Sequence, residues 1–127
     1  MQKESLIYIS DGTNIKWLRI FHLYGGFFKK QTSINFFCKG SAKKVTPPIN
    51  FYKGFKTKFF VKGAIVKILV IRTGQILKKN DASQIIIFNN SGIILKNKIA
   101  FQSKYFYGPI YAHFKRKKIK LLFKAKI

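Results

Sequence analysis

The side chains able to do chemistry are few in this 127-residue chain, and they do not combine into a reactive group. Carboxylates come only from Glu4, Asp11 and Asp81, whereas a glycosidase needs two acids flanking one bond and a magnesium site needs acidic ligands. His22 and His113 stand apart with no partner acid, so they do not make a catalytic pair. We therefore expect no catalytic residue, no metal site and no cofactor, in a protein that is not an enzyme.

Cys38 is the single cysteine, which excludes an internal disulfide and a zinc site built from cysteines. Lys39 and Lys43 follow it closely, and neighbouring cations can lower the pKa of a thiol. Its position at the end of a predicted strand favours plain burial instead. A reducing compartment suits such an unpaired cysteine.

Positive charge dominates the remaining chemistry. There are 26 Lys and Arg residues against 3 acids, which gives a net charge of +23. Three carboxylates cannot neutralise this charge in any fold, so a polyanionic partner is needed, either nucleic acid or an anionic membrane surface. The apolar content of 47% argues against a disordered basic tail. The longest apolar stretches are strand-length, whereas a membrane-spanning helix needs about 20 apolar residues.

Turn-forming residues recur at short intervals and separate stretches rich in Ile, Phe, Val and Tyr, a pattern typical of a small all-β barrel or sandwich. The expected strands cover residues 6–10, 16–23, 34–38, 59–61, 64–72, 84–88, 93–95 and 98–101. Apolar residues occupy both period-two faces of residues 64–72, so this strand should be covered on both sides, with Lys67 reaching out. Residues 78–81 are expected to form the tip of a hairpin, and Lys39-Gly40-Ser41 to form a turn.

Residues 113–127 differ from the rest because they lack turn residues and carry Phe114, Ile119, Leu122 and Phe123 at approximately helical spacing. We expect a short basic helix or tail here. It follows a barrel domain over residues 1–112 that carries an extended basic loop at about residues 39–60. A membrane-lying amphipathic helix has a similar pattern, so a basic protein that binds membrane surfaces through this segment is the alternative function.

Lysines interleaved with aromatic residues predict contacts with nucleic acid, because phosphates attract Lys and unstacked bases rest on Phe or Tyr rings. Residues 27–30, 51–56 and 105–107 have this composition. The other interpretation is that the rings belong to the core and the lysines form a solvated face. The RNA-binding residues predicted from charge are Arg19, Lys29, Lys30, Lys43, Lys44, Lys53, Lys56, Lys58, Lys78, Lys79, Lys115, Arg116, Lys117 and Lys118.

Five segments form an ordered set of short motifs: residues 10–16 (SDGTNIK), Gly25-Gly26, residues 61–73 (VKGAIVKILVIRT), residues 88–95 (FNNSGIIL) and residues 107–110 (YGPI). In order and with nearly the same spacing, these segments resemble motifs of the universal L14 family of large-subunit ribosomal proteins. The resemblance covers about residues 2–112. Asn89 stands where the family has Asp, residues 39–60 are longer than usual and residues 95–104 are shorter. These departures resemble an organellar version of the family.

The resemblance implies a fold and a set of contacts. The fold is mainly β, a small five-stranded β-barrel with a short C-terminal basic helical segment. The implied partners are large-subunit rRNA, neighbouring large-subunit proteins, and small-subunit rRNA reached by the hairpin that follows Arg72. Carried over onto matching positions, the RNA contacts include Asn14, Lys16, Lys62 and Arg72.

Location is inferred from composition and from the N-terminus. Phe, Ile, Lys, Asn and Tyr are the residues favoured by AT-rich codons, and they are abundant in this chain. The first residues have neither a secretory signal nor an Arg-rich amphipathic pattern. We expect an organelle-encoded structural protein of the mitochondrial large ribosomal subunit, located in the matrix, that binds no membrane and does not form homo-oligomers.

Overall fold

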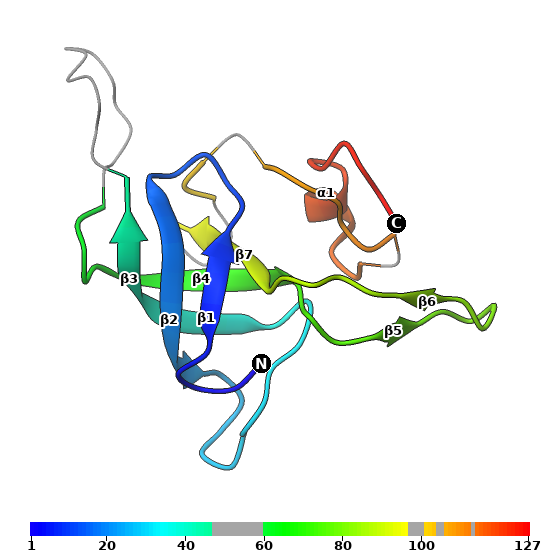
Figure 1. Ribbon diagram of the computed structural model, residues 1–127, viewed down its shortest axis with the longest axis horizontal. Coiled ribbons are helices and arrows are strands. Elements are labelled where there is room, and N and C mark those ends of the chain that lie inside the picture. Colours follow the sequence, from blue (N-terminus) through cyan, green and yellow to red (C-terminus); the bar gives the residue numbers. More distant parts are fainter. Residues whose placement is uncertain (47–59, 97–100, 104–105, 113) are drawn as a thin grey trace.

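A closed barrel of five strands forms the body of the protein (Figure 1). The computed structural model describes residues 1–46, 60–96, 101–103, 106–112 and 114–127. The barrel strands are β1 (Leu6–Ile9), β2 (Ile15–Leu23), β3 (Phe37–Val45), β4 (Ile65–Arg72) and β7 (Ser91–Leu95). Neighbours pair antiparallel except β1 and β7, whose parallel pairing closes the barrel. The predicted mainly β, five-stranded barrel is confirmed.

The barrel interior is filled by residues that alternate along each strand. Ile7 and Ile9 of β1, Leu18 and Ile20 of β2, and Ile68 of β4 all lie within one buried cluster. Their neighbours in sequence point outward, as the period of two in a strand requires. Because five strands enclose one core of mainly Ile, Leu and Val side chains, the barrel is a rigid body that fixes the positions of the side chains on its surface.

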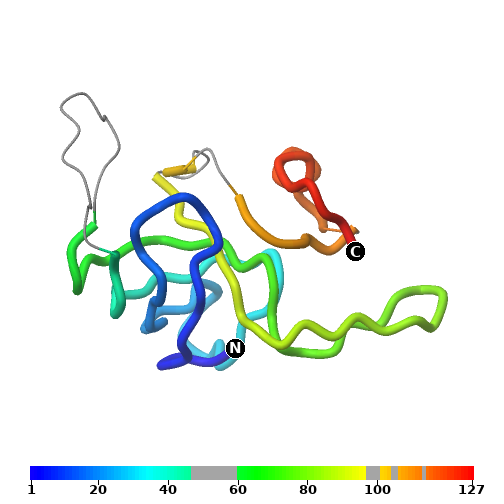
Figure 2. The backbone as a smooth tube through the Cα atoms, turned by 45° about the horizontal axis from the view of Figure 1, so that its top comes forward, coloured from blue at the N-terminus to red at the C-terminus, as the bar shows by residue number. Residues whose placement is uncertain are grey.

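A second apolar cluster lies outside the barrel, on β4 and β7. Leu69 and Ile71 of β4 are completely buried there, against Ile110, Phe114 and Phe123 from the last part of the chain. Strand β4 is therefore covered on both faces, as its sequence predicts. Figure 2 shows this C-terminal segment folded back beside the barrel. The segment contains the one helix among the described residues, α1 (Lys117–Lys120), which is only 4 residues long.

The third strand lies elsewhere than the sequence pattern predicts. A strand over residues 34–38, ending at a Lys39-Gly40-Ser41 turn, is wrong, because β3 starts at Phe37 and runs through this supposed turn to Val45. Gly40 lies in the strand because a Cβ atom there would be 2.7 Å from the carbonyl oxygen of Arg19 on β2. The glycine marks close approach of two backbones rather than a turn. The expected basic loop at about residues 39–60 is therefore wrong for residues 39–45.

The other boundaries shift less. Phe60 and Val61 are outside the named strands, so the predicted strand at 59–61 is wrong for these two residues. Most of the predicted strand at 98–101 lies outside the described residues, although Phe101 forms an isolated bridge with Leu95. Ser91 and Gly92, which have the composition of a turn, begin β7 instead.

A hairpin projects from the barrel between β4 and β7 (Figures 1 and 2). Its strands are β5 (Leu77–Lys78) and β6 (Gln84–Ile85), which pair antiparallel. The predicted hairpin tip around residues 78–81 is confirmed, while the strand expected at 84–88 is shorter. None of the helices in the described part of the chain is long and apolar enough to cross a membrane.

Candidate nucleic-acid interface

Irregular pairing of β2 with β3 places basic side chains on the outer wall of the barrel. Ile15 pairs with Val45, and the next pair is Trp17 with Lys44, so Lys16 is an extra residue in β2. Leu18 then pairs with Ala42, so Lys43 is an extra residue in β3. A bulge of this kind re-aims side chains and leaves the extra residue outside the ladder. Both extra residues are exposed lysines.

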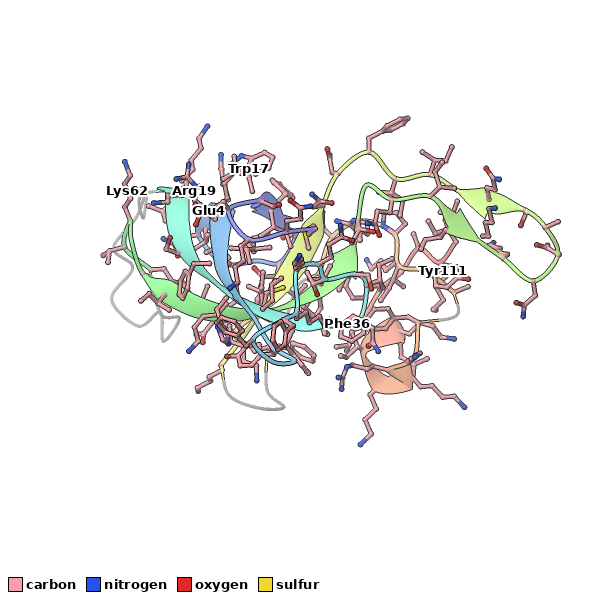
Figure 3. All side chains as sticks on the ribbon, turned by 90° about the horizontal axis from the view of Figure 1, so that it is seen from below. Glu4, Trp17, Arg19, Phe36, Lys62 and Tyr111 are labelled. Atoms are coloured by element: carbon pink, nitrogen blue, oxygen red, sulfur yellow. The ribbon has the colours of Figure 1, made fainter. Side chains whose placement is uncertain are left out.

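Four cations on these two strands form what we term the wall patch. Its members are Lys16, Arg19, Lys43 and Lys44, and all four are exposed. An aromatic pair lies among them, because Tyr8 of β1 contacts Trp17 edge to face with 5.5 Å between ring centroids. Figure 3 shows Trp17 and Arg19 along one side of the barrel. The structure therefore gathers cations and rings that the sequence places on three separate segments.

The connection between β2 and β3 carries two further predicted residues. Lys30 is exposed, and Lys29 is half-buried with its Nζ 3.9 Å from the centre of the Phe36 ring. A cation above an aromatic face is attracted by the ring quadrupole. Lys29 is therefore held in place by the protein while Lys30 extends into solvent, where it can meet an anion.

The tip of the β5–β6 hairpin is a tight turn with a basic stem. The amide of Lys79 donates to the carbonyl of Ser83 at 2.8 Å, and Ala82 adopts a positive φ of 67°. The carboxylate of Asp81 accepts hydrogen bonds from the amide and the hydroxyl of Ser83. These bonds favour the ionised form and lower the pKa of Asp81. Lys78 is exposed and Lys79 is half-buried.

The C-terminal segment presents cations outward and apolar groups inward. Its predicted contacts Lys115, Arg116, Lys117 and Lys118 are all exposed. The Arg116 guanidinium lies 4.6 Å from the centre of the Phe37 ring. Phe114 and Phe123 are buried in the cluster on β4, with Ile119 packed against it. Since these side chains already cover the barrel, most of the apolar face that a membrane-lying helix needs is used internally.

Arg72 points into the protein rather than to the surface. It is 7% exposed, and its Nη1 donates to the carbonyl oxygens of Tyr107 at 3.1 Å and Pro109 at 2.8 Å. Burial lowers its pKa. A Cβ atom on Gly108, whose φ is +84°, would lie 2.3 Å from the same nitrogen, so only glycine allows the chain to pass this close.

Asp11, like Arg72, contacts the segment 106–109. Asp11 bridges to Phe106, and the amide of Tyr107 donates to the carbonyl of Ser10 at 2.8 Å. The Asp11 carboxylate accepts from Thr13 and, at 2.9 Å, from the amide of Ile94. Burial is the main effect and raises its pKa. We refer to Ser10, Asp11, Arg72 and residues 106–109 as the barrel corner.

Asn14 also acts as a connector. Its side-chain nitrogen donates to the carbonyls of Thr46 at 3.3 Å and Phe60 at 2.7 Å, and its oxygen accepts from the amide of Phe60 at 2.9 Å. Asn14 and Arg72 are both predicted to contact RNA. These hydrogen bonds give each of them a structural role inside the protein, and their roles at RNA stay predictions.

Of the remaining predicted RNA contacts, one lies in the described part of the chain and three do not. Lys62 is exposed beside Gly63, whereas Lys53, Lys56 and Lys58 lie outside the described residues. The sequence predicted an outward-facing Lys67 but not its contact with an aromatic ring, and the Lys67 Nζ lies 4.7 Å from the centre of the Phe37 ring. The Tyr8–Trp17 pair was not predicted. The period of two in the strands could have indicated both contacts, because Lys67, Tyr8 and Trp17 each alternate with inward-facing residues of their own strand.

Metal binding and thiol chemistry are the two other functions to which the described residues speak. Among the residues that the structure describes, no three His, Cys, Asp or Glu side chains gather as metal ligands. Cys38 is completely buried, which confirms plain burial, and desolvation raises the pKa of its thiol to about 11. A thiol with that pKa is protonated and unreactive at neutral pH.

Sequence comparison identifies the family of this chain. The chain matches the family model described as ribosomal protein L14p/L23e over residues 1–126. It is 32% identical over 118 residues to the large ribosomal subunit protein uL14m of Tetrahymena pyriformis, covering 93% of this chain and 92% of that protein. It is 25% identical over 111 residues to uL14 of Petrotoga mobilis, covering 87% and 83%. With the family model matched along almost its whole length, the chain belongs to the ribosomal protein L14p/L23e family.

Proposed function

We propose that this chain is a structural protein of the mitochondrial large ribosomal subunit and binds large-subunit rRNA through its outer cations. Proteins of its family are structural components of ribosomes, not enzymes. The similarity to uL14m, a mitochondrial large-subunit protein, supports the organelle. The AT-biased composition supports an organellar gene as well.

The wall patch is the observation that carries the RNA-binding proposal. Four exposed cations, two of them on bulges, are fixed to a rigid barrel, while the carboxylates of Asp11 and Asp81 are engaged by hydrogen bonds within their own turns. Lysine and arginine side chains that neutralise phosphates release bound counterions, so affinity falls steeply with salt. Because the groups are spread over a curved wall, recognition depends on RNA shape rather than on a base code.

The β5–β6 hairpin is our candidate for contact with small-subunit rRNA. It extends away from the barrel, and its stem carries Lys78 and Lys79 (Figure 2). Its base exposes Ile76, Ile86 and Phe88, at 56%, 56% and 92%. Exposed apolar side chains of this kind mark a protein contact, so we expect a neighbouring large-subunit protein to cover the base of the hairpin. The hairpin thus offers a basic tip for RNA and an apolar base for protein.

Sedimentation tests the proposal. We would fractionate an extract of the source organelle on sucrose gradients at moderate and high salt and locate this protein by mass spectrometry. Co-migration with the large subunit at both salt concentrations, abolished by ribonuclease, is the expected result. Migration at the top of the gradient, or with membranes, would contradict it.

A further inference from the structure

Two phenylalanine rings, Phe27 and Phe28, are exposed to solvent within the connection between β2 and β3, residues 24–36. Phe27 is 93% exposed and Phe28 is 88% exposed, so neither contributes to a core cluster. The rings contact each other edge to face, with 5.4 Å between centroids and 83° between planes. Figure 1 shows this connection projecting from the end of the barrel beyond β2. Leaving two large rings in water is unfavourable unless a partner covers them.

The local backbone is built to hold the pair outward. Gly25 and Gly26 adopt φ values of +122° and +106°, which side-chain-bearing residues rarely adopt. The amide of Lys29 donates to the carbonyl of Gly26 at 3.3 Å, closing a turn around the two rings. A Cβ atom on Gly25 would lie 2.8 Å from Cδ of Lys29, so the glycine also makes room for that side chain.

A cation is fixed close to the rings in sequence. Lys29 Nζ sits 3.9 Å from the centre of the Phe36 ring, and Lys30 next to it is exposed. Residues 24–36 contain no acid. Four consecutive residues, 27–30, therefore supply two exposed rings, one ammonium group held against Phe36 and one ammonium group in solvent.

We propose that Phe27 and Phe28 form a stacking platform for unpaired bases of the large-subunit rRNA, with Lys29 and Lys30 neutralising the adjacent phosphates. This proposal rests on the rRNA-binding function proposed above and names its mode. Unstacked bases rest on aromatic faces whatever their identity, and cations close by hold the backbone. Rings set at right angles present separate faces, which suits splayed single-stranded nucleotides.

Charge and area favour RNA over a protein pocket. A stable protein interface buries about 800 Å² on each side, whereas an aromatic side chain supplies about 150–250 Å² when buried. Two rings alone fall short of that area, and the ammonium groups beside them would have to be desolvated or paired with acids. Phosphates supply the negative charge without any further requirement.

Substitution by leucine and by tyrosine distinguishes base stacking on RNA from apolar contact with a protein. Phe27→Leu with Phe28→Leu keeps apolar bulk but removes the ring faces, while Phe27→Tyr with Phe28→Tyr keeps the faces and adds polarity. Binding of each full-length variant to purified large-subunit rRNA would be measured at several salt concentrations. Ile65→Ala is the control, because Ile65 is 65% exposed on β4 and lies in none of the proposed contact surfaces. Circular dichroism confirms that each variant is folded.

We expect the leucine pair to weaken rRNA binding about 5- to 150-fold for each stacked base that is lost, and the tyrosine pair to bind like the natural chain. The Ile65→Ala control should change rRNA binding by less than about twofold, since it removes no stacked base. Leucine variants that bind normally, or tyrosine variants that lose as much affinity as leucine variants, would overturn the platform.

Ultraviolet cross-linking of intact ribosomes gives a second readout. Mass spectrometry of the tryptic peptide spanning residues 20–29 should find a nucleotide attached at Phe27 or Phe28. Attachment only to a neighbouring protein, or no attachment, would mean that these rings serve another contact. If the natural chain itself failed to bind rRNA or to co-sediment with the large subunit, the broader function would fail instead, so the two failures are distinguishable.

Discussion

The barrel corner and the hairpin tip contain the same local turn in opposite surroundings. Asp11 accepts a hydrogen bond from the amide of Thr13 at 3.0 Å, and Asp81 accepts one from the amide of Ser83 at 3.1 Å. In both turns the hydroxyl two residues after the aspartate donates to the same carboxylate oxygen. Asp11, however, is 5% exposed, whereas Asp81 is exposed.

Opposite pKa shifts follow from this difference. Burial outweighs the hydrogen bonds at Asp11 and raises its pKa, while at Asp81 the bonds from Ser83 dominate and lower its pKa. The cations of the two regions differ in the same way. Arg72 of the corner is committed to backbone carbonyls, and Lys78 of the tip faces solvent. The comparison shows that a carboxylate and a cation are buried and support the fold in one region, whereas a carboxylate and a cation stay exposed to solvent in the other.

Replacing the cations gives the largest expected contrast. Arg72→Met should lower the free energy of unfolding by about 2–3 kcal/mol, because the carbonyls of Tyr107 and Pro109 lose a charged donor inside the protein. Lys78→Met, at the tip, should leave the unfolding midpoint unchanged. Urea denaturation at high salt, followed by the fluorescence of Trp17, the single tryptophan, measures both. Equal destabilisation by the two variants would break the comparison.

The two aspartates give the next contrast. Asp11→Ala should cost about 1–2 kcal/mol of unfolding free energy, because the buried amide of Ile94 loses its acceptor together with the Thr13 bonds. Asp81→Ala should cost less under the same conditions, because the Ser83 groups that lose their acceptor are exposed to water. The same denaturation experiment applies, and a stable Asp11→Ala protein would show that the corner does not depend on this carboxylate.

The pH dependence of stability should have opposite signs in the two turns. A raised pKa means that folded Asp11 keeps its proton where the unfolded chain has lost it, so its contribution falls as pH rises from about 3.8 through the raised value. A lowered pKa means that Asp81 contributes above about 3.8 and loses this contribution as pH falls through the lowered value. Denaturation curves between about pH 3 and pH 7, each variant subtracted from the natural chain, isolate the two slopes. Slopes of the same sign would show that hydrogen bonds within each turn, and not burial, determine the direction of both pKa shifts.

The smallest effect on stability is expected from the basic stem of the hairpin. Lys78→Gln with Lys79→Gln should leave folding and large-subunit incorporation unchanged but weaken association with the small subunit. The slope of log K against log salt concentration should become shallower by about 0.7–0.9 for each phosphate that the variant no longer neutralises. Lys3→Gln with Lys96→Gln removes the same charge from exposed positions elsewhere and serves as the control. An unchanged subunit association would exclude the tip as an RNA contact.

Sequence pattern determined the all-β class and the charge. Apolar residues on both period-two faces of residues 64–72 predicted that β4 is covered on both sides, and β4 is buried between the barrel interior and the C-terminal segment. Of the four apolar residues at helical spacing near the C-terminus, Phe114, Ile119 and Phe123 face inward, whereas Leu122 is 47% exposed. The excess of lysine over acid needed no structure to indicate a polyanionic partner, because three carboxylates cannot offset 26 cations.

Tertiary structure alone decided register and which polar groups face solvent. The extra residues Lys16 and Lys43 depend on how β2 meets β3, and Gly40 belongs to a strand because the backbone of Arg19 lies against it. Arg72 resembles a surface cation in sequence, yet segment 106–109, more than thirty residues later, arrives to accept its hydrogen bonds. Burial and hydrogen bonding between distant segments set the free energy of such groups, and a local pattern contains no information about which segments will meet.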